Sequence, residues 1–170
     1  MEQDLFLEYL EGRAGKSAWR IRALTDKSVK GHVLEDEDVN TELATYGDAV
    51  LKLALCELLL DQVDELTIEK QKYESDVALV RIGEYYDITK YLRFDRDNPG
   101  IPQDYRFIKM DPKFSTGKKE KVRKFNRKRK YIATAIEAVL GAIYHDHRDF
   151  AEILAIVGKW KQLTDSFEAE

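Results

Sequence analysis

The sequence predicts an all-α fold, a single bundle of helices, on three observations. Glycine and proline are sparse, with nine and three among 170 residues. Apolar residues recur at helical spacing along almost the whole chain, and no run alternates with period two for long enough to indicate a sheet. The length suits one domain with its own hydrophobic core. We therefore expect residues 1–170 to form one helical domain.

Helices are expected wherever apolar side chains recur every three to four residues. Ser17 and Thr67 are suitable N-caps, because their hydroxyls can accept a hydrogen bond from the first turn. The motif DNPGIP at residues 97–102 is the one strong helix breaker. We expect it to open a long, partly basic loop over residues 97–130. The expected helices cover residues 2–11, 17–29, 40–60, 67–86, 87–93, 128–146 and 149–165.

Two of these helices are expected to be central, and each carries one acidic residue in its interior. Apolar side chains face nearly all directions in residues 43–59, and they follow the i, i+3, i+4, i+7 pattern in residues 132–144. Asp48 lies in the first and Glu137 in the second. A buried carboxylate is costly unless something binds it. Two such acids on two central helices suggest a shared cation.

Positive charge is concentrated in one segment of an otherwise acidic chain. The segment KKEKVRKFNRKRK, Lys118 to Lys130, holds nine Lys or Arg against one Glu, a local charge of +8. The whole chain carries −4, so the rest carries −12, with 19 basic and 31 acidic residues. This asymmetry indicates a binding role for the basic segment, or alternatively a solvated surface.

The sequence also favours a cytoplasmic protein. No stretch approaches the roughly 18 apolar residues that a membrane-spanning helix needs. The N-terminus MEQDLFLEYLEG is acidic and lacks the basic start of a signal peptide. A single cysteine, Cys56, excludes an internal disulfide and suits a reducing compartment.

Two motifs carry a resemblance to a known family. NTELATYGDAVL, residues 40–51, resembles the signature of the ribonuclease III catalytic domain, NERLEFLGDAVL, at seven of twelve positions. TAIEAVLGAIYHD, residues 134–146, resembles the family's second acidic motif, DAFEALIGAIYLD, at eight of thirteen. The likeness spans about residues 17–165. It implies a ribonuclease III-like endonuclease fold, a divalent metal, double-stranded RNA as substrate and a homodimer.

Several positions depart from the family pattern. The family typically uses four carboxylates per subunit, and two of them fall on Ala44 and Thr134 here. Thr41 stands at the signature's first glutamate, and Thr45 at the phenylalanine that normally enters the partner subunit. The compact Mini-III branch has similar replacements and a basic loop before the second acidic helix. It also lacks a double-stranded-RNA-binding domain, and we expect none here.

The resemblance assigns roles to the remaining acids. Asp48 and Glu137 would be the catalytic residues and would bind Mg²⁺, for which Mn²⁺ can substitute. Thr134, one turn before Glu137, could orient a water. Lys52 can pair with Asp48 at i, i+4, and it either neutralises this acid or contacts a phosphate. The alternative is that both acids only form pairs within the core.

RNA binding is expected of the basic segment. Its charge would neutralise several phosphates, and A-form RNA is recognised mainly by shape and backbone. The residues expected to contact RNA are Lys118, Lys119, Lys121, Arg123, Lys124, Arg127, Lys128, Arg129 and Lys130.

The leading hypothesis is a magnesium-dependent endoribonuclease that cleaves double-stranded or structured RNA, for example in ribosomal RNA precursor maturation. The alternative is a catalytically inactive ribonuclease III-like protein that binds RNA or the ribosome, which Ala44, Thr134 and Lys52 favour. A helical nucleotide phosphohydrolase built on His145 and His147 has little support, because the helical spacing of such ligands is missing.

Overall fold

The computed structural model describes residues 4–29, 39–94 and 116–169, together with the side chains of these residues other than Ser17 and residues 116–128. The described part contains helices and no β-strand, and its one isolated bridge joins Thr25 to Arg93. This confirms the all-α prediction. The elements are α1 (Leu5–Leu10), α2 (Ser17–Ala23), η1 (Lys27–Val29), α3 (Thr41–Leu59), α4 (Leu66–Glu74), α5 (Asp76–Tyr85), η3 (Ile88–Lys90), α6 (Thr116–His147) and α7 (Phe150–Ala169).

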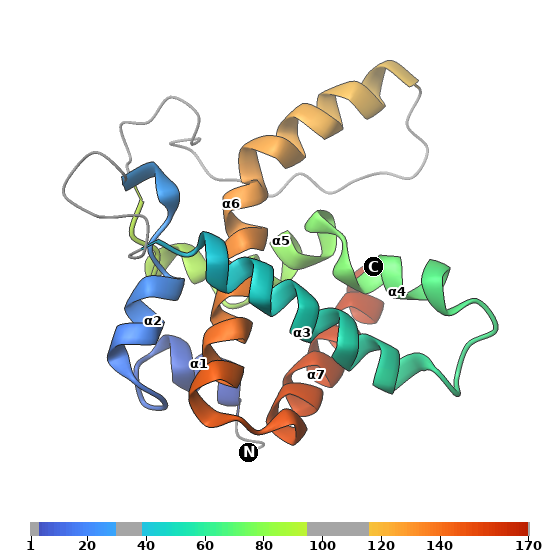
Figure 1. The fold of residues 1–170 in the computed structure, drawn as a ribbon. Coiled ribbons are helices and arrows are strands. Elements are labelled where there is room, and N and C mark those ends of the chain that lie inside the picture. Colours follow the sequence, from blue (N-terminus) through green and yellow to red (C-terminus); the bar gives the residue numbers. More distant parts are fainter. Residues whose placement is uncertain (1–3, 30–38, 95–115, 170) are drawn as a thin grey trace.

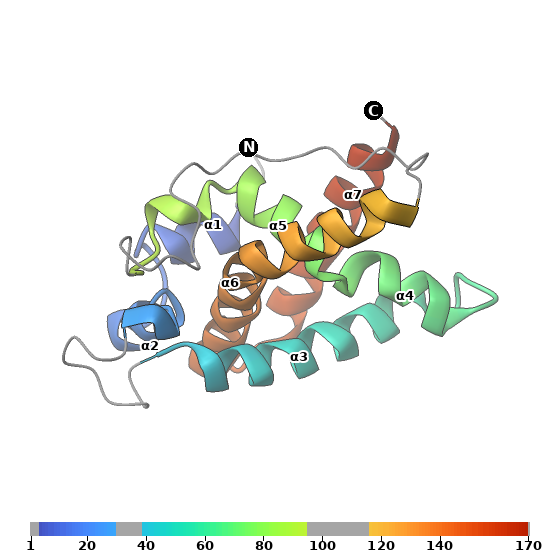
Figure 2. The same ribbon diagram turned by 90° about the horizontal axis from the view of Figure 1, so that it is seen from above.

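The second half of α6 forms the centre of the bundle. α3 crosses it, while α1, α2, α5 and α7 surround it (Figures 1 and 2). This central position follows from the sequence pattern, because the apolar positions of this part of the helix are buried, among them Ile132, Ile136, Val139, Leu140 and Ile143. The expected central position is therefore confirmed for residues 132–144, whereas α3 packs against α6 with one side and exposes the other, where Leu53 is 53% exposed.

The expected helix over residues 67–86 is two helices. Ser75 has an extended backbone, with φ −67° and ψ 148°, and its hydroxyl accepts a hydrogen bond from the Ala78 amide at 3.2 Å. Ser75 thus ends α4 and caps α5, which periodicity alone does not reveal. The predictions of Ser17 and Thr67 as N-caps are wrong. Ser17 lies within α2, whose N-cap is Lys16, and Thr67 lies within α4, whose N-cap is Glu65.

The segment expected as helix 87–93 contains only a short 3₁₀ turn. Asp87 adopts a left-handed conformation with φ 50° and precedes η3, and Tyr91 follows it. A left-handed residue cannot continue an α-helix, so α5 ends at Tyr85.

α6 begins at Thr116, well before the predicted start at residue 128. The expected loop therefore does not extend to residue 130, and residues 95–115 lie outside the described part. The correction has a simple reason: beyond Gly117 the segment has neither glycine nor proline, and Lys and Arg are good helix formers. The basic segment is thus helical and continuous with the helix of Glu137.

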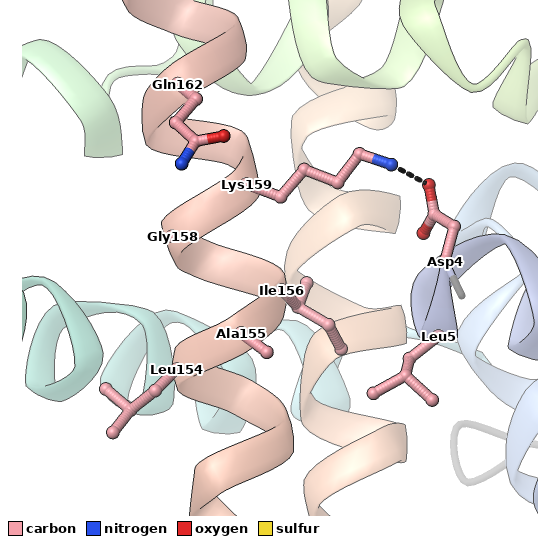
Figure 3. A pocket seen from close by; sticks show the side chains of 8 residues that line it. All are labelled: Asp4, Leu5, Leu154, Ala155, Ile156, Gly158, Lys159 and Gln162. Atoms are coloured by element: carbon pink, nitrogen blue, oxygen red, sulfur yellow. Dashed lines mark hydrogen bonds and ion pairs between the residues drawn. The ribbon is translucent and has the colours of Figure 1, made fainter. Parts of the chain in front are cut away.

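The N-terminal helix α1 closes one side of the bundle. Phe6 is fully buried and contacts the rings of Tyr86 and Trp160, with centroids 4.9 and 5.0 Å apart. Beside it, a groove between α1 and α7 is spanned by the ion pair of Lys159 and Asp4 at 2.6 Å (Figure 3). None of the predicted site residues lines this groove. Within the described residues, no helix is both long and apolar enough to cross a membrane.

Candidate active site

Two glycines bring the acidic helices together. A Cβ atom added to Gly47 of α3 would overlap the carbonyl oxygen of Glu137, and one added to Gly141 of α6 would overlap the carbonyl oxygen of Leu43. The two backbones therefore touch, and a residue with a Cβ atom at either position would prevent this contact. This contact places Asp48, the residue after Gly47, beside the helix turn that carries Glu137. We call the two acids and these glycines the acidic crossing.

Asp48 lies at the edge of the crossing and is paired. Its side chain is 35% exposed, and the Lys52 amine donates a hydrogen bond to its Oδ2 at 2.7 Å. This i, i+4 pair was expected from the spacing, and it raises the pKa of the Lys52 amine. The lysine supplies positive charge directly beside this acid.

Glu137 is the more perturbed of the two acids. Burial raises its pKa to about 7, and the negative charges of Asp48 and Asp76 contribute in the same direction. Lys130 and Lys52 oppose these effects and lower the pKa. A carboxyl group that is half-buried among other carboxylates holds its negative charge poorly. The crossing is therefore a place where additional positive charge would be stabilising.

Asp76 is a residue of this site that sequence reasoning missed. It is the first residue of α5, and its carboxylate forms an ion pair with the Lys130 amine, with Oδ2 and Nζ 3.6 Å apart. No motif marks it, and it lies on neither acidic helix. The one available signal is its position directly after Ser75, because an acidic residue in the first turn stabilises the N-terminus of a helix. That signal concerns local structure and does not indicate proximity to Glu137.

The residues at the altered family positions have different surroundings. Ala44 is buried, with 6% exposure, so it lies inside its own subunit and not on a surface. Thr45 is exposed, and its hydroxyl donates a hydrogen bond to the Thr41 carbonyl at 3.2 Å. Thr134 is half-buried one turn before Glu137. Of these, only Thr134 adds a polar group on the Glu137 helix.

A divalent cation would have two protein carboxylates at this crossing. No group of three or more His, Cys, Asp or Glu side chains in the described part of the chain is arranged to hold a metal. Mg²⁺ commonly uses one or two carboxylates and completes its octahedron with waters and substrate phosphates. Asp48 and Glu137 fit this donor set, because they are two carboxylates on helices whose backbones touch at Gly47 and Gly141, and the raised pKa of Glu137 agrees with it. Binding would require Lys52 to release Asp48.

The structure corrects the predicted role of Arg129. Its side chain is buried, with 2% exposure, and its guanidinium forms an ion pair with Glu84 of α5. Arg129 therefore joins α6 to α5 and does not present its charge on the surface. Lys130 is 64% exposed. The side chains of the other predicted RNA-contacting residues, from Lys118 to Lys128, lie outside the described residues.

The two histidines near the end of α6 have structural partners. The His145 ring packs against Trp19, with centroids 4.1 Å apart. His147 Nδ1 lies 2.6 Å from Glu152, and between the two histidines Asp146 accepts a hydrogen bond from the Lys16 backbone. These contacts hold α2 and α7 to the end of α6, and they give the phosphohydrolase alternative no support.

Comparisons with known proteins agree with this architecture. The model of the ribonuclease III domain family matches residues 41–148. Ribonuclease 3 of Natranaerobius thermophilus is 30% identical over 129 residues, which cover 73% of this chain and 46% of the relative. The chain thus spans about half the length of that relative. The crystal structure of the nuclease domain of ribonuclease III from Campylobacter jejuni has the same fold, with a TM-score of 0.59 at 20% identity, covering 94% of this chain and 96% of that one.

Proposed function

Because this chain belongs to the ribonuclease III domain family, we propose that it is an endoribonuclease that hydrolyses phosphodiester bonds in double-stranded or structured RNA. The proposal includes Mg²⁺ as cofactor, with Mn²⁺ able to replace it. Maturation of a structured RNA, such as a ribosomal RNA precursor, is the biological role that we propose.

The acidic crossing is the observation that carries the proposal. Asp48 and Glu137 come from motifs 89 residues apart in sequence, and the Gly47–Gly141 contact brings their helices into direct contact. Burial raises the pKa of Glu137 to about 7, and repulsion from Asp48 adds to this effect. A structural ion pair would not require such a destabilised acid. Perturbed acids of this kind are frequent at functional sites, and a bound cation would relieve the destabilisation.

The residues of the crossing have separate roles in this mechanism. Asp48 and Glu137 would hold the cation, and Glu137 would lose its proton on binding it. When bound, a divalent cation neutralises phosphate charge and lowers the pKa of a water. Lys52, once it has released Asp48, would be free to contact a phosphate oxygen of the substrate. The hydroxyl of Thr134 would orient a water.

The basic segment would hold the RNA. Eight cations remain after Arg129 is assigned to the ion pair with Glu84. They lie on a helix, which presents charge to the backbone of a duplex without reading its sequence. Recognition of shape and backbone charge is what we propose for substrate selection.

We also propose a homodimer with one active site per subunit, which would cut the two strands at staggered positions. The exposed side of α3 includes Thr45, Lys52 and Leu53, and Leu53 is 53% exposed. Ala44 is buried and is not part of that face. Sedimentation at micromolar concentration should give about twice the chain mass of 19.8 kDa. A strict monomer would remove the staggered double cut.

A second function stays open because of the Asp48–Lys52 ion pair. A lysine 2.7 Å from one of only two carboxylates could replace the cation permanently. The protein would then bind RNA or the ribosome without cutting. Incubation with long double-stranded RNA, with and without magnesium, separates the two functions. Products that depend on the metal support the nuclease. Binding without cleavage in magnesium and manganese, on several RNAs, supports the binding protein.

A further inference from the structure

The basic segment and the acidic crossing belong to one uninterrupted helix. α6 runs from Thr116 to His147 and contains both Lys118 and Glu137. Its first part extends beyond the other helices (Figure 1). The direction of the basic segment relative to Glu137 is therefore set wherever α6 enters the bundle. Arg129 is buried in the bundle at the C-terminal end of the basic segment, so its contacts bear on that direction.

Arg129 is held by a buried ion pair. Its side chain is 2% exposed, and Glu84, its partner near the C-terminal end of α5, is 20% exposed. Burying a guanidinium is costly unless a partner compensates for the lost hydration. Glu84 provides this compensation, and the pair joins α6 to α5 at a place that water hardly reaches, unlike an exposed pair.

The next residue is held at the opposite end of α5. Lys130 pairs with Asp76 at 3.6 Å. Asp76 and Glu84 are eight residues apart, which corresponds to about 12 Å along the helix. Neighbouring residues of α6 thus reach two well-separated points of one partner helix. The buried pair is the stronger constraint on α6, and the exposed Lys130–Asp76 pair, with side chains 64% and 44% exposed, adds a weaker contact at the other end of α5.

A further contact lies in the following residue. The Tyr131 ring packs against Phe94, which follows η3, with centroids 5.8 Å apart. Three successive residues of α6 therefore contact both ends of α5 and the segment after η3, at the C-terminal end of the basic segment.

This anchor lies between the two functional regions. Lys130 precedes Glu137 by seven residues, two helical turns on the same face and about 10 Å along the axis. The Lys130 charge lowers the pKa of Glu137, and that of Asp76 raises it, so both groups lie within electrostatic reach of the crossing.

We propose that Asp76 and Glu84 of α5 are positioning residues that anchor the base of the basic segment, and so determine which phosphodiester of a bound RNA reaches Asp48 and Glu137. The proposal rests on the proposed function and extends it to a helix outside both acidic motifs. Asp76 and Glu84 touch no reacting atom. They act through Lys130 and Arg129.

Single-turnover cleavage of an end-labelled RNA duplex at saturating protein tests the effect on the reaction. The cations of the segment are intact in Asp76→Asn and Glu84→Gln, so RNA affinity should stay within roughly threefold of the wild type. The saturated rate should fall about tenfold or more, and cuts should spread to neighbouring phosphodiesters, because small displacements are costly in catalysis. An unchanged rate and cut position in both variants would overturn the proposal.

A matched control separates positioning from stability. Asp165→Asn removes an acid that binds Lys72 at 2.8 Å and joins α7 to α4, away from α6. It should lower the thermal midpoint without changing the saturated rate or the cut position. If Asp165→Asn reduces the rate and scatters the cuts as much as Glu84→Gln does, the effect is one of stability and the positioning role is wrong.

A distance measurement tests whether Asp76 and Glu84 anchor the basic segment, even if the wild type does not cleave RNA. Spin labels on Cys56, the chain's single cysteine, and on a Lys121→Cys variant would report the distance between α3 and the basic segment. The distance distribution should be narrow in the parent protein and clearly broader in Glu84→Gln and Asp76→Asn. Equal widths in all three proteins would overturn the anchor. Absence of cleavage by the wild type would count against the proposed function alone.

Discussion

The two halves of α6 differ in their surroundings and in their composition, although they form one helix. From Arg129 onward the helix is buried among other helices, and its backbone touches that of α3 at Gly141. Before Arg129 it carries dense positive charge and extends beyond the bundle (Figure 1). The buried half depends on shape, since a single methyl group at the crossing meets backbone atoms. RNA binding by the charged half is expected to depend on the number of its cations, since each phosphate contact adds to the affinity and needs no exact side-chain geometry.

This difference predicts how each half responds to substitution. Single changes at the acidic crossing should have large and local effects, while single changes in the basic segment should be small and cumulative. The predictions below test that contrast, beginning with the largest effect.

The largest effect is expected from the carboxylates themselves. Asp48→Asn or Glu137→Gln should reduce RNA cleavage by roughly a thousandfold or more, because the charge that holds the metal is lost. Single-turnover rates at saturating RNA measure the loss, and circular dichroism should show an intact fold.

Glu42→Gln is the matched control for this experiment. It removes one carboxylate from the first turn of α3, where the Glu42 side chain is 81% exposed and pairs with Arg22. Cleavage by this variant should be close to that of the wild type. Near-normal cleavage by both Asp48→Asn and Glu137→Gln would remove the site assignment.

A second large effect is expected from the glycine contact. Gly47→Ala should lower the free energy of unfolding by about 3 kcal/mol, because the added methyl collides with the Glu137 carbonyl and forces the helices apart. Urea denaturation measures this change. Cleavage should fall as well, since Asp48 moves with α3.

Gly158→Ala is the counterpart in a helix that has room for it. A Cβ at Gly158 of α7 meets nothing within 4 Å. Alanine should therefore stabilise the protein by up to about 1 kcal/mol through helix propensity. Equal effects of the two substitutions would contradict the close contact at the crossing.

The acidic crossing was predictable because both of its motifs are local. Asp48 and Glu137 each stand alone on an apolar helix, and the glycines lie in the same short motifs. Even the Asp48–Lys52 pair follows from i, i+4 spacing. Properties that depend on spacing within one helix, such as its apolar positions and its i, i+4 pairs, could be predicted from the sequence.

The anchor was not predictable, because its partners meet only in the folded chain. Arg129 is one of nine cations within 13 residues, and nothing in the sequence distinguishes it from its neighbours. Its burial arises from the position where α5 packs on α6. The helical start at Thr116 was accessible through the absence of glycine and proline beyond Gly117, but the charge of the segment favoured an interpretation as a loop.

A moderate effect is expected from the basic segment. Lys121, Lys124 and Lys128 changed together to Ala should weaken RNA binding about tenfold or more near physiological salt. They should flatten the slope of log affinity against log salt by up to about three units. The change should be uniform across RNA sequences. Fluorescence anisotropy at several salt concentrations measures both quantities.

The control for the basic segment removes the same charge elsewhere. Lys16, Lys27 and Lys90 are exposed and lie outside α6. Their combined change to Ala should leave the salt slope nearly unchanged. If both triple variants lose the same affinity, net charge alone governs binding and the segment has no special role.

The smallest effect is the pH dependence that Glu137 gives to stability. The folded state holds this proton up to about pH 7, whereas the unfolded chain releases it near the ordinary value of 4.5. The folded state therefore binds more protons in this window, so its free energy of unfolding falls as the pH rises from about 4.5 to about 7. Because the side chain is half-buried and partly screened by water, we expect a loss of about 1–2 kcal/mol.

Comparison with Glu137→Gln isolates this contribution, since all other titrating groups are shared. Urea denaturation at pH 5 and pH 8 should show the variant gaining stability relative to the wild type as the pH rises. Saturating magnesium at pH 8 should reduce that difference, because a cation held by Asp48 and Glu137 compensates the charge that makes the ionised acid costly. Parallel pH profiles would mean that Glu137 is an ordinary solvated carboxylate. A pH-dependent difference that magnesium leaves unchanged would instead favour Lys52 as the permanent counter-ion, and with it the binding protein over the nuclease.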